Sequence, residues 1–244
     1  MSAPRLLLCA PASGGGKTTV TCALLQALVN RGAGPVAFKC GPDYIDPMFH
    51  SEIIGAKSRN LDLFFLGRDT ARYLLEKNSR GSGLALIEGV MGYYDGIGLS
   101  ADASAYDLAR ATGTPAVLVL DEPAAGLDPE GREMILSQVK RFHKETGTTV
   151  ILVSHSMEDI AKYADKVLVM DQRRIAMYDT VEHVFARADE LLELGLSVPQ
   201  VTKVFLRLRA MGLDLPQDVY TVPYAVKTIQ AALAKKNGGG EATC

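Results

Sequence analysis

A glycine-rich segment between an apolar run and a helical pattern is the feature that most constrains this chain. Apolar residues 6–10 precede glycines at 14–16, then Lys17 and Thr18, and apolar residues recur at helical spacing afterwards. Glycines let main-chain N–H groups curve around a phosphate, and a helix N-terminus favours negative charge. The segment therefore predicts a phosphate-binding loop between a strand and a helix, with a plain turn as the alternative.

Each part of this loop has an expected role in holding ATP and Mg²⁺. Lys17 would reach the β- and γ-phosphate oxygens, and the Thr18 hydroxyl would ligate Mg²⁺. Pro11 replaces the first glycine of the usual pattern, but the strand–loop–helix setting supports the assignment. The predicted nucleotide-binding residues are Ser13, Gly14, Gly15, Gly16, Lys17, Thr18 and Thr19.

Further apolar runs alternate with amphipathic segments along the chain. Residues 20–28 and 131–144 predict helices, with Gly32 just beyond the first. Residues 171–174 predict a hairpin turn. We therefore expect an α/β, P-loop NTPase-like fold: a mostly parallel sheet with helices on both faces, an antiparallel edge hairpin and a short helical C-terminal segment. The runs that predict strands buried on both faces are 6–10, 36–38, 84–87, 116–120, 150–153 and 167–170.

Length and composition narrow the class of protein. The 244 residues are 48% hydrophobic and 22% charged, with a formal net charge of -2. These values predict a folded globule without the basic surface that nucleic acid requires. The four cysteines form no Cys-x-x-Cys pair, which favours a reducing, cytoplasmic location. No apolar run approaches the ~20 residues of a membrane-spanning helix.

Three motifs follow the loop in order. They are Phe38-Lys39-Cys40-Gly41-Pro42-Asp43-Tyr44-Ile45-Asp46-Pro47-Met48-Phe49-His50, Asn60-Leu61-Asp62 and Glu88-Gly89-Val90-Met91-Gly92-Tyr93-Tyr94-Asp95-Gly96. Residues 4–120 closely resemble the ATP-binding synthetase domain of cobyrinate a,c-diamide synthases. The resemblance is carried by these three motifs together with Ala10-Pro11-Ala12-Ser13-Gly14. In that family ATP phosphorylates a corrinoid carboxylate, and ammonia released from glutamine by a separate C-terminal domain attacks the acyl phosphate.

The resemblance implies a metal and substrate site at the strand ends. Glu88 would hold Mg²⁺ directly or through water, together with Thr18, and Lys17 and Glu88 would be catalytic. The expected substrate-binding residues are Asp43, Tyr44, Asp46 and Asp95.

Three residues of these motifs have alternative roles. Asp43 and Asp46 would also serve as caps of turns beside the neighbouring prolines. His50 is either a loop histidine with ordinary hydrogen bonds or a catalytic group.

From residue 116 onward the motifs are those of another family. Asp121-Glu122-Pro123-Ala124-Ala125-Gly126-Leu127-Asp128-Pro129 looks like the Walker B and D-loop segment of ABC ATPases, and residues 150–159 match their switch-histidine region. Residues 194–202 are similar to the tail of energy-coupling factor transporter ATPases, which power cobalt and vitamin uptake. Residues 116–225 thus resemble the C-terminal half of such an ATPase.

This second resemblance implies its own catalytic groups. Asp121 would hold Mg²⁺ through water, Glu122 would polarise the attacking water, and His155 would contact the γ-phosphate. The Leu-Ser-Gly-Gly-Gln-type signature and the Q-loop of that family are missing before Asp121. No Cys–His pair suited to glutamine hydrolysis is present either, so we expect free ammonia to substitute.

The two resemblances meet at a strand followed by an aspartate, residues 117–121, which both families have. Transporter ATPases place the His155-type strand between the phosphate-loop strand and the Walker B strand, whereas synthetases place the Glu88-type strand beside the phosphate loop. A carboxylate that is displaced by one strand, ~5 Å, can no longer ligate the metal directly, so Glu88 and Asp121 cannot both do so. We predict that Glu88 lies nearer to Thr18 than Asp121 does, because Glu88 shares the resemblance of the phosphate loop.

The resemblances divide the chain into four expected parts. They are residues 1–120, a synthetase-like half; 121–190, an ABC-ATPase-like half completing the same domain; 191–236, a helical segment; and 237–244, a disordered tail.

Three functions remain open at this point. The first is a Mg-ATP-binding, synthetase-like protein with ATP-dependent phosphoryl-transfer activity on a corrinoid carboxylate. The second is a transporter ATPase subunit or remnant, peripheral to the inner membrane, which would dimerise and dock a membrane partner. The third is an inactive nucleotide-binding fusion product.

Overall fold

The computed structural model describes residues 3–238, which form two compact units. The first unit comprises the chain up to Gly126 and Gln138–Val153, and the second comprises Leu127–Ser137 and the chain from Ser154 onward. The expected boundaries after residues 120 and 190, which follow the two resemblances, stay predictions. Helix α5 (Pro129–Thr146) begins in the second unit and ends in the first.

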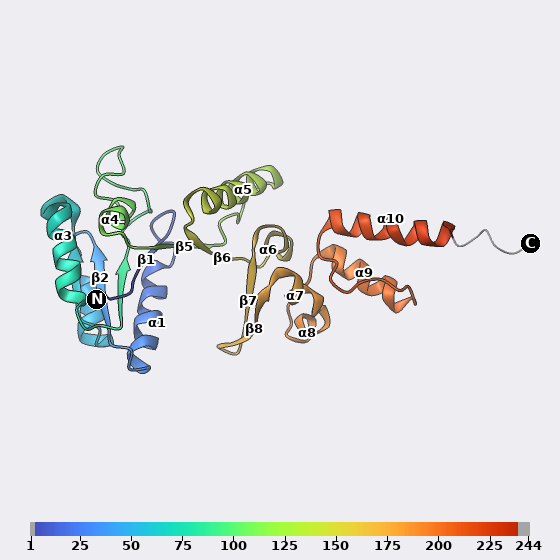
Figure 1. The fold of residues 1–244 in the computed structure, drawn as a ribbon, viewed down its shortest axis with the longest axis horizontal. Coiled ribbons are helices and arrows are strands. Elements are labelled where there is room, and N and C mark those ends of the chain that lie inside the picture. The colour runs from blue at the N-terminus through green and yellow to red at the C-terminus, as the bar shows by residue number, and fades with distance from the viewer. Residues whose placement is uncertain (1–2, 239–244) are drawn as a thin grey trace, which may run out of the picture. The chain divides into compact units, whose positions relative to one another are not determined.

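A six-stranded sheet, in which every pair of neighbours is parallel, forms the centre of the first unit (Figure 1). Its spatial order is β3-β2-β4-β1-β5-β6. The strand β1 therefore has partners on both sides, β4 and β5. The strands are β1 (Arg5–Cys9), β2 (Pro35–Cys40), β3 (Ser58–Leu61), β4 (Leu84–Glu88), β5 (Ala116–Asp121) and β6 (Thr149–Val153).

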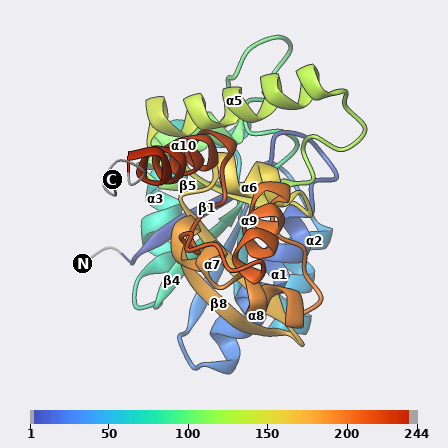
Figure 2. The ribbon, with the colours of Figure 1, turned by 90° about the vertical axis from the view of Figure 1, so that its right-hand side faces the viewer.

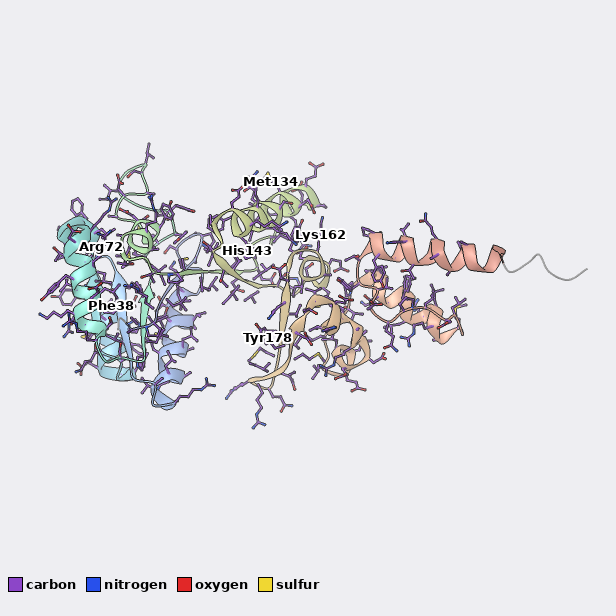
Figure 3. The ribbon with its side chains drawn as sticks, viewed as in Figure 1. Phe38, Arg72, Met134, His143, Lys162 and Tyr178 are labelled. Carbon is purple, nitrogen blue, oxygen red and sulfur yellow. The ribbon has the colours of Figure 1, made fainter. Side chains whose placement is uncertain are left out.

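Helices cover both faces of this sheet because alternate strand residues point to opposite sides. Leu7 packs in a core with residues of α3 (Leu63–Ser79), α4 (Ala105–Thr112) and the end of α5. Leu8 packs in a second core with residues of α1 (Lys17–Asn30) and the π-helical turn η1 (Phe49–Ile54), which continues α2 (Ile45–Met48). Figure 3 shows Phe38 inside this unit, where it belongs to the first core. The predicted P-loop-type α/β fold is confirmed.

The predicted end of the first helix is also confirmed. The α1 helix ends at Asn30, and Gly32 adopts a left-handed conformation with φ of 69°. Its N–H donates to the carbonyl of Val29 at 2.9 Å, which satisfies one of the last helical carbonyls.

The second unit contains the predicted hairpin and a group of helices. Strands β7 (Lys166–Asp171) and β8 (Arg174–Thr180) pair antiparallel as a two-stranded sheet of their own. Helix α7 (Val181–Ala186) lies beside both strands (Figures 1 and 2). Its residue Phe185 is buried in the core of this unit. The remaining helices are α6 (Met157–Tyr163), α8 (Ala188–Glu193), α9 (Gln200–Ala210) and α10 (Val222–Gly238).

Three details differ from the sequence-based expectations. The hairpin is not an edge of the main sheet but a separate sheet. The apolar runs at 150–153 and 167–170 are not buried on both faces, because β6 and β7 expose alternate residues such as Ile151 and Leu168. Of the expected disordered tail, residues 237–238 end α10 and residues 239–244 lie outside the described part of the chain. None of the helices in the described residues has both the length and the apolar character of a membrane span.

Gly83, just before β4, packs so closely against the main chain of Ala33 that no side chain fits there. A Cβ atom at Gly83 would lie 1.9 Å from the carbonyl oxygen of Ala33, so Gly83→Ala must displace the backbone that leads into β2. We expect the variant to lose about 2 kcal/mol or more of unfolding free energy, measured by urea denaturation. Arg80→Ala, an exposed position in the same loop, is the control and should change it by less than about 0.5 kcal/mol. Equal stabilities would contradict this close approach of the two segments.

Candidate functional site

The glycine-rich loop lies between β1 and α1 at the carboxyl edge of the parallel sheet. Gly14 and Gly16 adopt positive φ angles of 80° and 73°, which favour glycine. Gly16 is the N-cap of α1 and provides no side-chain acceptor, so the first helical N–H groups face the cavity in front of them. This cavity has a volume of about 390 Å³ and is lined by Ser13, Gly14, Gly15, Gly16, Lys17, Thr18, Thr19, Lys39, Gly89, Val90 and Met91. All the predicted nucleotide-binding residues therefore line one cavity.

The ammonium group of Lys17 lies against two main-chain carbonyls. Its Nζ donates to the oxygen of Met91 at 2.6 Å and to that of Ala12 at 3.1 Å. Burial lowers the pKa of Lys17, and the nearby charge of Lys39 lowers it further. Met91 itself has a positive φ of 49°. Phosphate oxygens are stronger partners for an ammonium group than these carbonyls.

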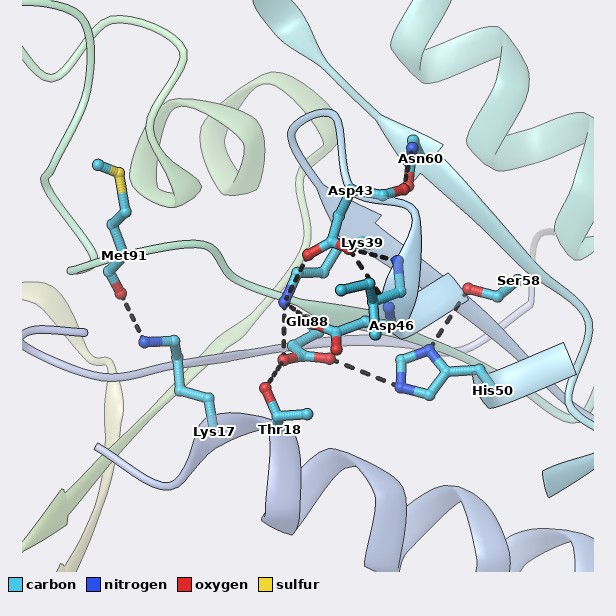
Figure 4. A network of polar contacts seen from close by, with 11 residues as sticks. Lys17, Thr18, Lys39, Asp43, Asp46, His50, Ser58, Asn60, Glu88 and Met91 are labelled. Carbon is cyan, nitrogen blue, oxygen red and sulfur yellow. Dashed lines mark hydrogen bonds and ion pairs between the residues drawn. The ribbon is translucent and has the colours of Figure 1, made fainter. Parts of the chain in front are cut away.

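Glu88, the last residue of β4, is a fully buried carboxylate directly beside the loop. Its Oε1 accepts a hydrogen bond from the Thr18 hydroxyl at 2.5 Å and another from Lys39 Nζ at 2.8 Å (Figure 4). The carboxylate that contacts Thr18 is thus Glu88, in agreement with the prediction that it lies nearer than Asp121.

The oxygen atoms of Thr18 and Glu88 fit a magnesium ion that is shared with a nucleotide. Mg²⁺ prefers hard oxygen ligands and commonly takes one or two from the protein, with phosphate and water completing the shell. Within residues 3–238, no group of three or more His, Cys, Asp or Glu residues is arranged to hold a metal ion. The hydroxyl of Thr18 and the carboxylate of Glu88 are the kind of oxygen donors that would share Mg²⁺ with phosphate oxygens.

Lys39 also lines the cavity, although the sequence motifs gave it no role. It lies in β2, whose residues are all buried, and its Nζ is 2.5 Å from Asp46 Oδ2 and 3.9 Å from Asp43 Oδ2. Burial opposes its charge, but the hydrogen bonds to Asp46 and Glu88 outweigh this and raise the pKa of Lys39. The sequence did contain a signal for Lys39, because it is a lysine within an otherwise apolar strand. A buried charge requires a partner of opposite charge, so such a lysine indicates a buried ion pair.

The predicted substrate-binding residues have different surroundings. Asp43 accepts main-chain N–H groups of Ile45 at 2.9 Å and Asp46 at 3.3 Å, so it caps this turn, and its substrate role stays a prediction. Asp46, by contrast, binds Lys39.

Tyr44 and Asp95 lie away from the buried network. The Tyr44 side chain is 89% exposed. Asp95 is also exposed, and its Oδ2 accepts the N–H of Gly92 at 2.7 Å, which closes the turn after β4. Their substrate roles stay predictions.

His50 is not a loop histidine with ordinary hydrogen bonds. It lies fully buried in η1, with Nε2 3.6 Å from Glu88 Oε2 and Nδ1 3.4 Å from the Ser58 hydroxyl. Burial lowers the pKa of His50, so the ring is neutral near pH 7. Its Nε2 has no hydrogen-bond partner within the described residues.

The acidic residues implied by the second resemblance lie at the end of β5, on the other side of β1. Asp121 is exposed at the end of β5, and Glu122 follows it with a φ of 45°. The strand that precedes His155, β6, lies outside β5 and not between β1 and β5. The Glu88 strand, β4, pairs directly with β1, which is the order that the synthetase resemblance implies. His155 belongs to the second unit, and the roles of these residues stay predictions.

The family model of the CobQ/CobB/MinD/ParA nucleotide binding domain matches residues 6–201. The chain belongs to this family. Its match therefore includes the phosphate loop, Lys39 and Glu88, and a nucleotide-binding role for the cavity follows from both geometry and family membership.

Two groups of curated relatives each match about half of the chain. The chain is 48% identical to the cobyrinate a,c-diamide synthase of Thermoplasma acidophilum over 121 residues, which are 50% of this chain and 27% of the relative. It is 50% identical to the energy-coupling factor transporter ATP-binding protein EcfA2 of Symbiobacterium thermophilum over 124 residues, 51% of this chain and 43% of the relative. Both resemblances are confirmed, and the chain spans less than half the length of either relative.

A solved structure gives a weaker likeness. The signal recognition particle 54 kDa protein of Aeropyrum pernix K1, in complex with GDP, aligns with a TM-score of 0.46 and 21% identity. The alignment covers 64% of this chain and 36% of that one.

The buried ion pair allows a direct test. Lys39→Met leaves the carboxylate of Glu88 buried without its main counter-charge, so we expect a loss of about 3–5 kcal/mol of unfolding free energy. Adding Glu88→Gln to this variant removes the unpaired charge and should restore most of the loss. Urea denaturation measures both, and Lys57→Met, at an exposed position, is the control. A Lys39→Met protein as stable as the control would contradict the described network.

Proposed function

We propose that the first unit binds Mg-ATP and uses it to phosphorylate a carboxylate of a corrinoid, as a step in ATP-dependent amidation. The observation that supports this best is the arrangement of Lys17, Lys39 and Glu88. Two lysines line one cavity together with the phosphate loop, and the buried carboxylate contacts both Thr18 and Lys39. The site thus combines cations for phosphate charge with an oxygen pair for Mg²⁺.

The proposed reaction has two displacements. A carboxylate oxygen of the substrate attacks the γ-phosphorus of ATP, the bond to the β–γ bridging oxygen breaks, and ADP leaves. Ammonia then attacks the carbon of the acyl phosphate, loses a proton and displaces inorganic phosphate, which forms the amide. Lys17 stabilises negative charge on the phosphoryl group during transfer. Lys39 supplies a second positive charge at the cavity wall, and bound Mg²⁺ supplies further neutralisation of the phosphate oxygens.

Exposed apolar side chains beside the cavity are a second observation in favour of a large, partly apolar substrate. Exposed apolar side chains occur on the segments that follow β2 and β4, at the same carboxyl edge of the sheet as the phosphate loop. Exposed apolar groups of this kind are typical of binding surfaces. Those residues include Tyr44, Ile45 and Met48 after β2, and Met91, Tyr94 and Ile97 after β4.

A second candidate function is that of a transporter ATPase subunit, which the identity to EcfA2 supports. Such a chain would form a dimer and dock a membrane partner. The sheet order favours the synthetase function, since β4 and β5 flank β1 and β6 lies outside them. The third candidate is a protein that binds nucleotide without turnover.

Lys17→Ala tests nucleotide binding. Each lost charge-assisted hydrogen bond costs about 1.5–3 kcal/mol, so we expect Mg-ATP to bind at least ~10-fold more weakly. Isothermal titration calorimetry of the full chain measures the affinity, with Lys57→Ala as the control at an exposed lysine. Unchanged affinity in Lys17→Ala would rule out the phosphate-loop assignment.

A second pair of variants separates the synthetase from the transporter function. Turnover is measured as ADP release with cobyrinate and ammonium present. Glu88→Gln should lower it by about 100-fold, because a metal ligand is lost, whereas Glu122→Gln should leave it unchanged. The opposite pattern would favour the transporter ATPase.

Calorimetry of ATP binding with and without cobyrinate tests the substrate. If cobyrinate does not change the heat of ATP binding, this result would argue against corrinoid activation.

A further inference from the structure

Two buried polar atoms face each other behind the nucleotide cavity without a hydrogen bond. Nε2 of His50 and Oε2 of Glu88 are 3.6 Å apart, and both side chains are fully buried. In the part of the chain that the structure describes, neither atom has a hydrogen-bond partner. A buried polar atom left in this way costs about 1–3 kcal/mol, so the pair requires an explanation.

The distance of 3.6 Å between His50 Nε2 and Glu88 Oε2 is too short for a bridging water molecule and too long for a direct hydrogen bond. An N–H···O hydrogen bond measures about 2.7–3.2 Å, and a bridging water with two bonds of about 2.8 Å spans about 4.6 Å. A small movement of the carboxylate toward the ring therefore closes the gap directly.

The two oxygens of Glu88 face different partners (Figure 4). Oε1 faces Thr18 and Lys39 on the nucleotide side, whereas Oε2 faces His50 on the opposite side. Carboxylates that ligate metals are themselves held by outer hydrogen bonds, which fix their orientation. His50 Nε2, 3.6 Å from Glu88 Oε2, lies where such an outer partner would lie.

We propose that His50 is a positioning residue, which donates a hydrogen bond from Nε2 to Glu88 Oε2 when Glu88 Oε1 turns toward Mg²⁺ bound with the nucleotide. This inference rests on the proposed binding of Mg-nucleotide in the first unit. It adds a role for a residue that touches neither the nucleotide cavity nor the phosphate loop.

The surroundings of His50 hold the ring in the required orientation. Its main-chain oxygen accepts the N–H of Ala56 at 2.9 Å, and its Nδ1 lies 3.4 Å from the hydroxyl of Ser58. Ser58 is fixed in β3, where its N–H donates to the Ser51 hydroxyl at 3.0 Å. In the tautomer whose Nδ1 accepts from the Ser58 hydroxyl, the neutral ring carries its proton on Nε2, 3.6 Å from Glu88 Oε2, and the proposal requires this tautomer.

Three variants of the full chain test the proposal. The amide nitrogen of His50→Gln can reach the position of Nε2, that of His50→Asn reaches only as far as Nδ1, and His50→Leu has no donor. For each, the thermal midpoint is followed while Mg²⁺ is titrated at a fixed concentration of ADP, and again with EDTA in place of Mg²⁺. We expect His50→Asn and His50→Leu to need about 10–100-fold more Mg²⁺ for the half-maximal shift. His50→Gln should resemble wild type, and binding of ADP in EDTA should be unchanged in all.

The comparison of Gln with Asn decides the matter even if His50→Leu does not fold. Equal Mg²⁺ requirements in His50→Asn, His50→Gln and wild type would overturn the proposal. So would an equal loss of ADP binding in EDTA, or a failure of both polar variants to fold, because each outcome makes His50 a purely structural residue. A wild-type chain that shows no Mg²⁺-dependent shift rejects the proposed function itself, and with it this inference.

Discussion

The buried carboxylate of Glu88 is the constraint around which the site of the first unit is organised. A charge removed from water costs several kcal/mol unless counter-charges and hydrogen bonds compensate it. Thr18 supplies a hydrogen bond from the first turn of α1, and Lys39 supplies a counter-charge from β2. Lys39 in turn holds Asp46 at the start of α2. One carboxylate thus links the phosphate loop to the motif that follows β2, although these segments are far apart in sequence.

The strand order explains why this network forms on one side of the phosphate loop. Because β4 lies between β1 and β2, its last residue can reach a helix that follows β1 and a side chain that comes from β2. Asp121 ends the strand on the other side of β1, where its partner in the sheet is Val153 of β6. Glu88 is fully buried, whereas Asp121 is exposed. The two acidic strand ends therefore have different chemical surroundings, although each follows a buried apolar strand.

Local pattern was sufficient to predict the fold but not the side-chain partners. Apolar periodicity and the glycines at 14–16 predicted the parallel sheet, its two helical layers and the loop, because these depend on short-range spacing. Lys39 was not assigned a role, since its partners Glu88 and Asp46 come from segments that only the fold brings together. The burial of β6 and β7 was overestimated because an apolar run shows what a strand could bury, and not whether anything covers it. The position of His50 Nε2 opposite Glu88 was invisible in the sequence because it too depends on segments that meet only in the fold.

The first unit also shows how residues of the two resemblances share one core. The strand β5 pairs with β6 from Val117↔Thr149 to Asp121↔Val153, so the sheet continues across the point where the motifs change. The last turns of α5 then return to this unit, and Phe142 contacts the ring of Tyr94 at 6.2 Å between centroids. Tyr94 lies in the segment that follows Glu88, where Met91 offers its carbonyl to Lys17. The end of α5, a helix that belongs to the second resemblance, thus packs on the segment that follows Glu88, while every residue that lines the cavity comes from the first resemblance.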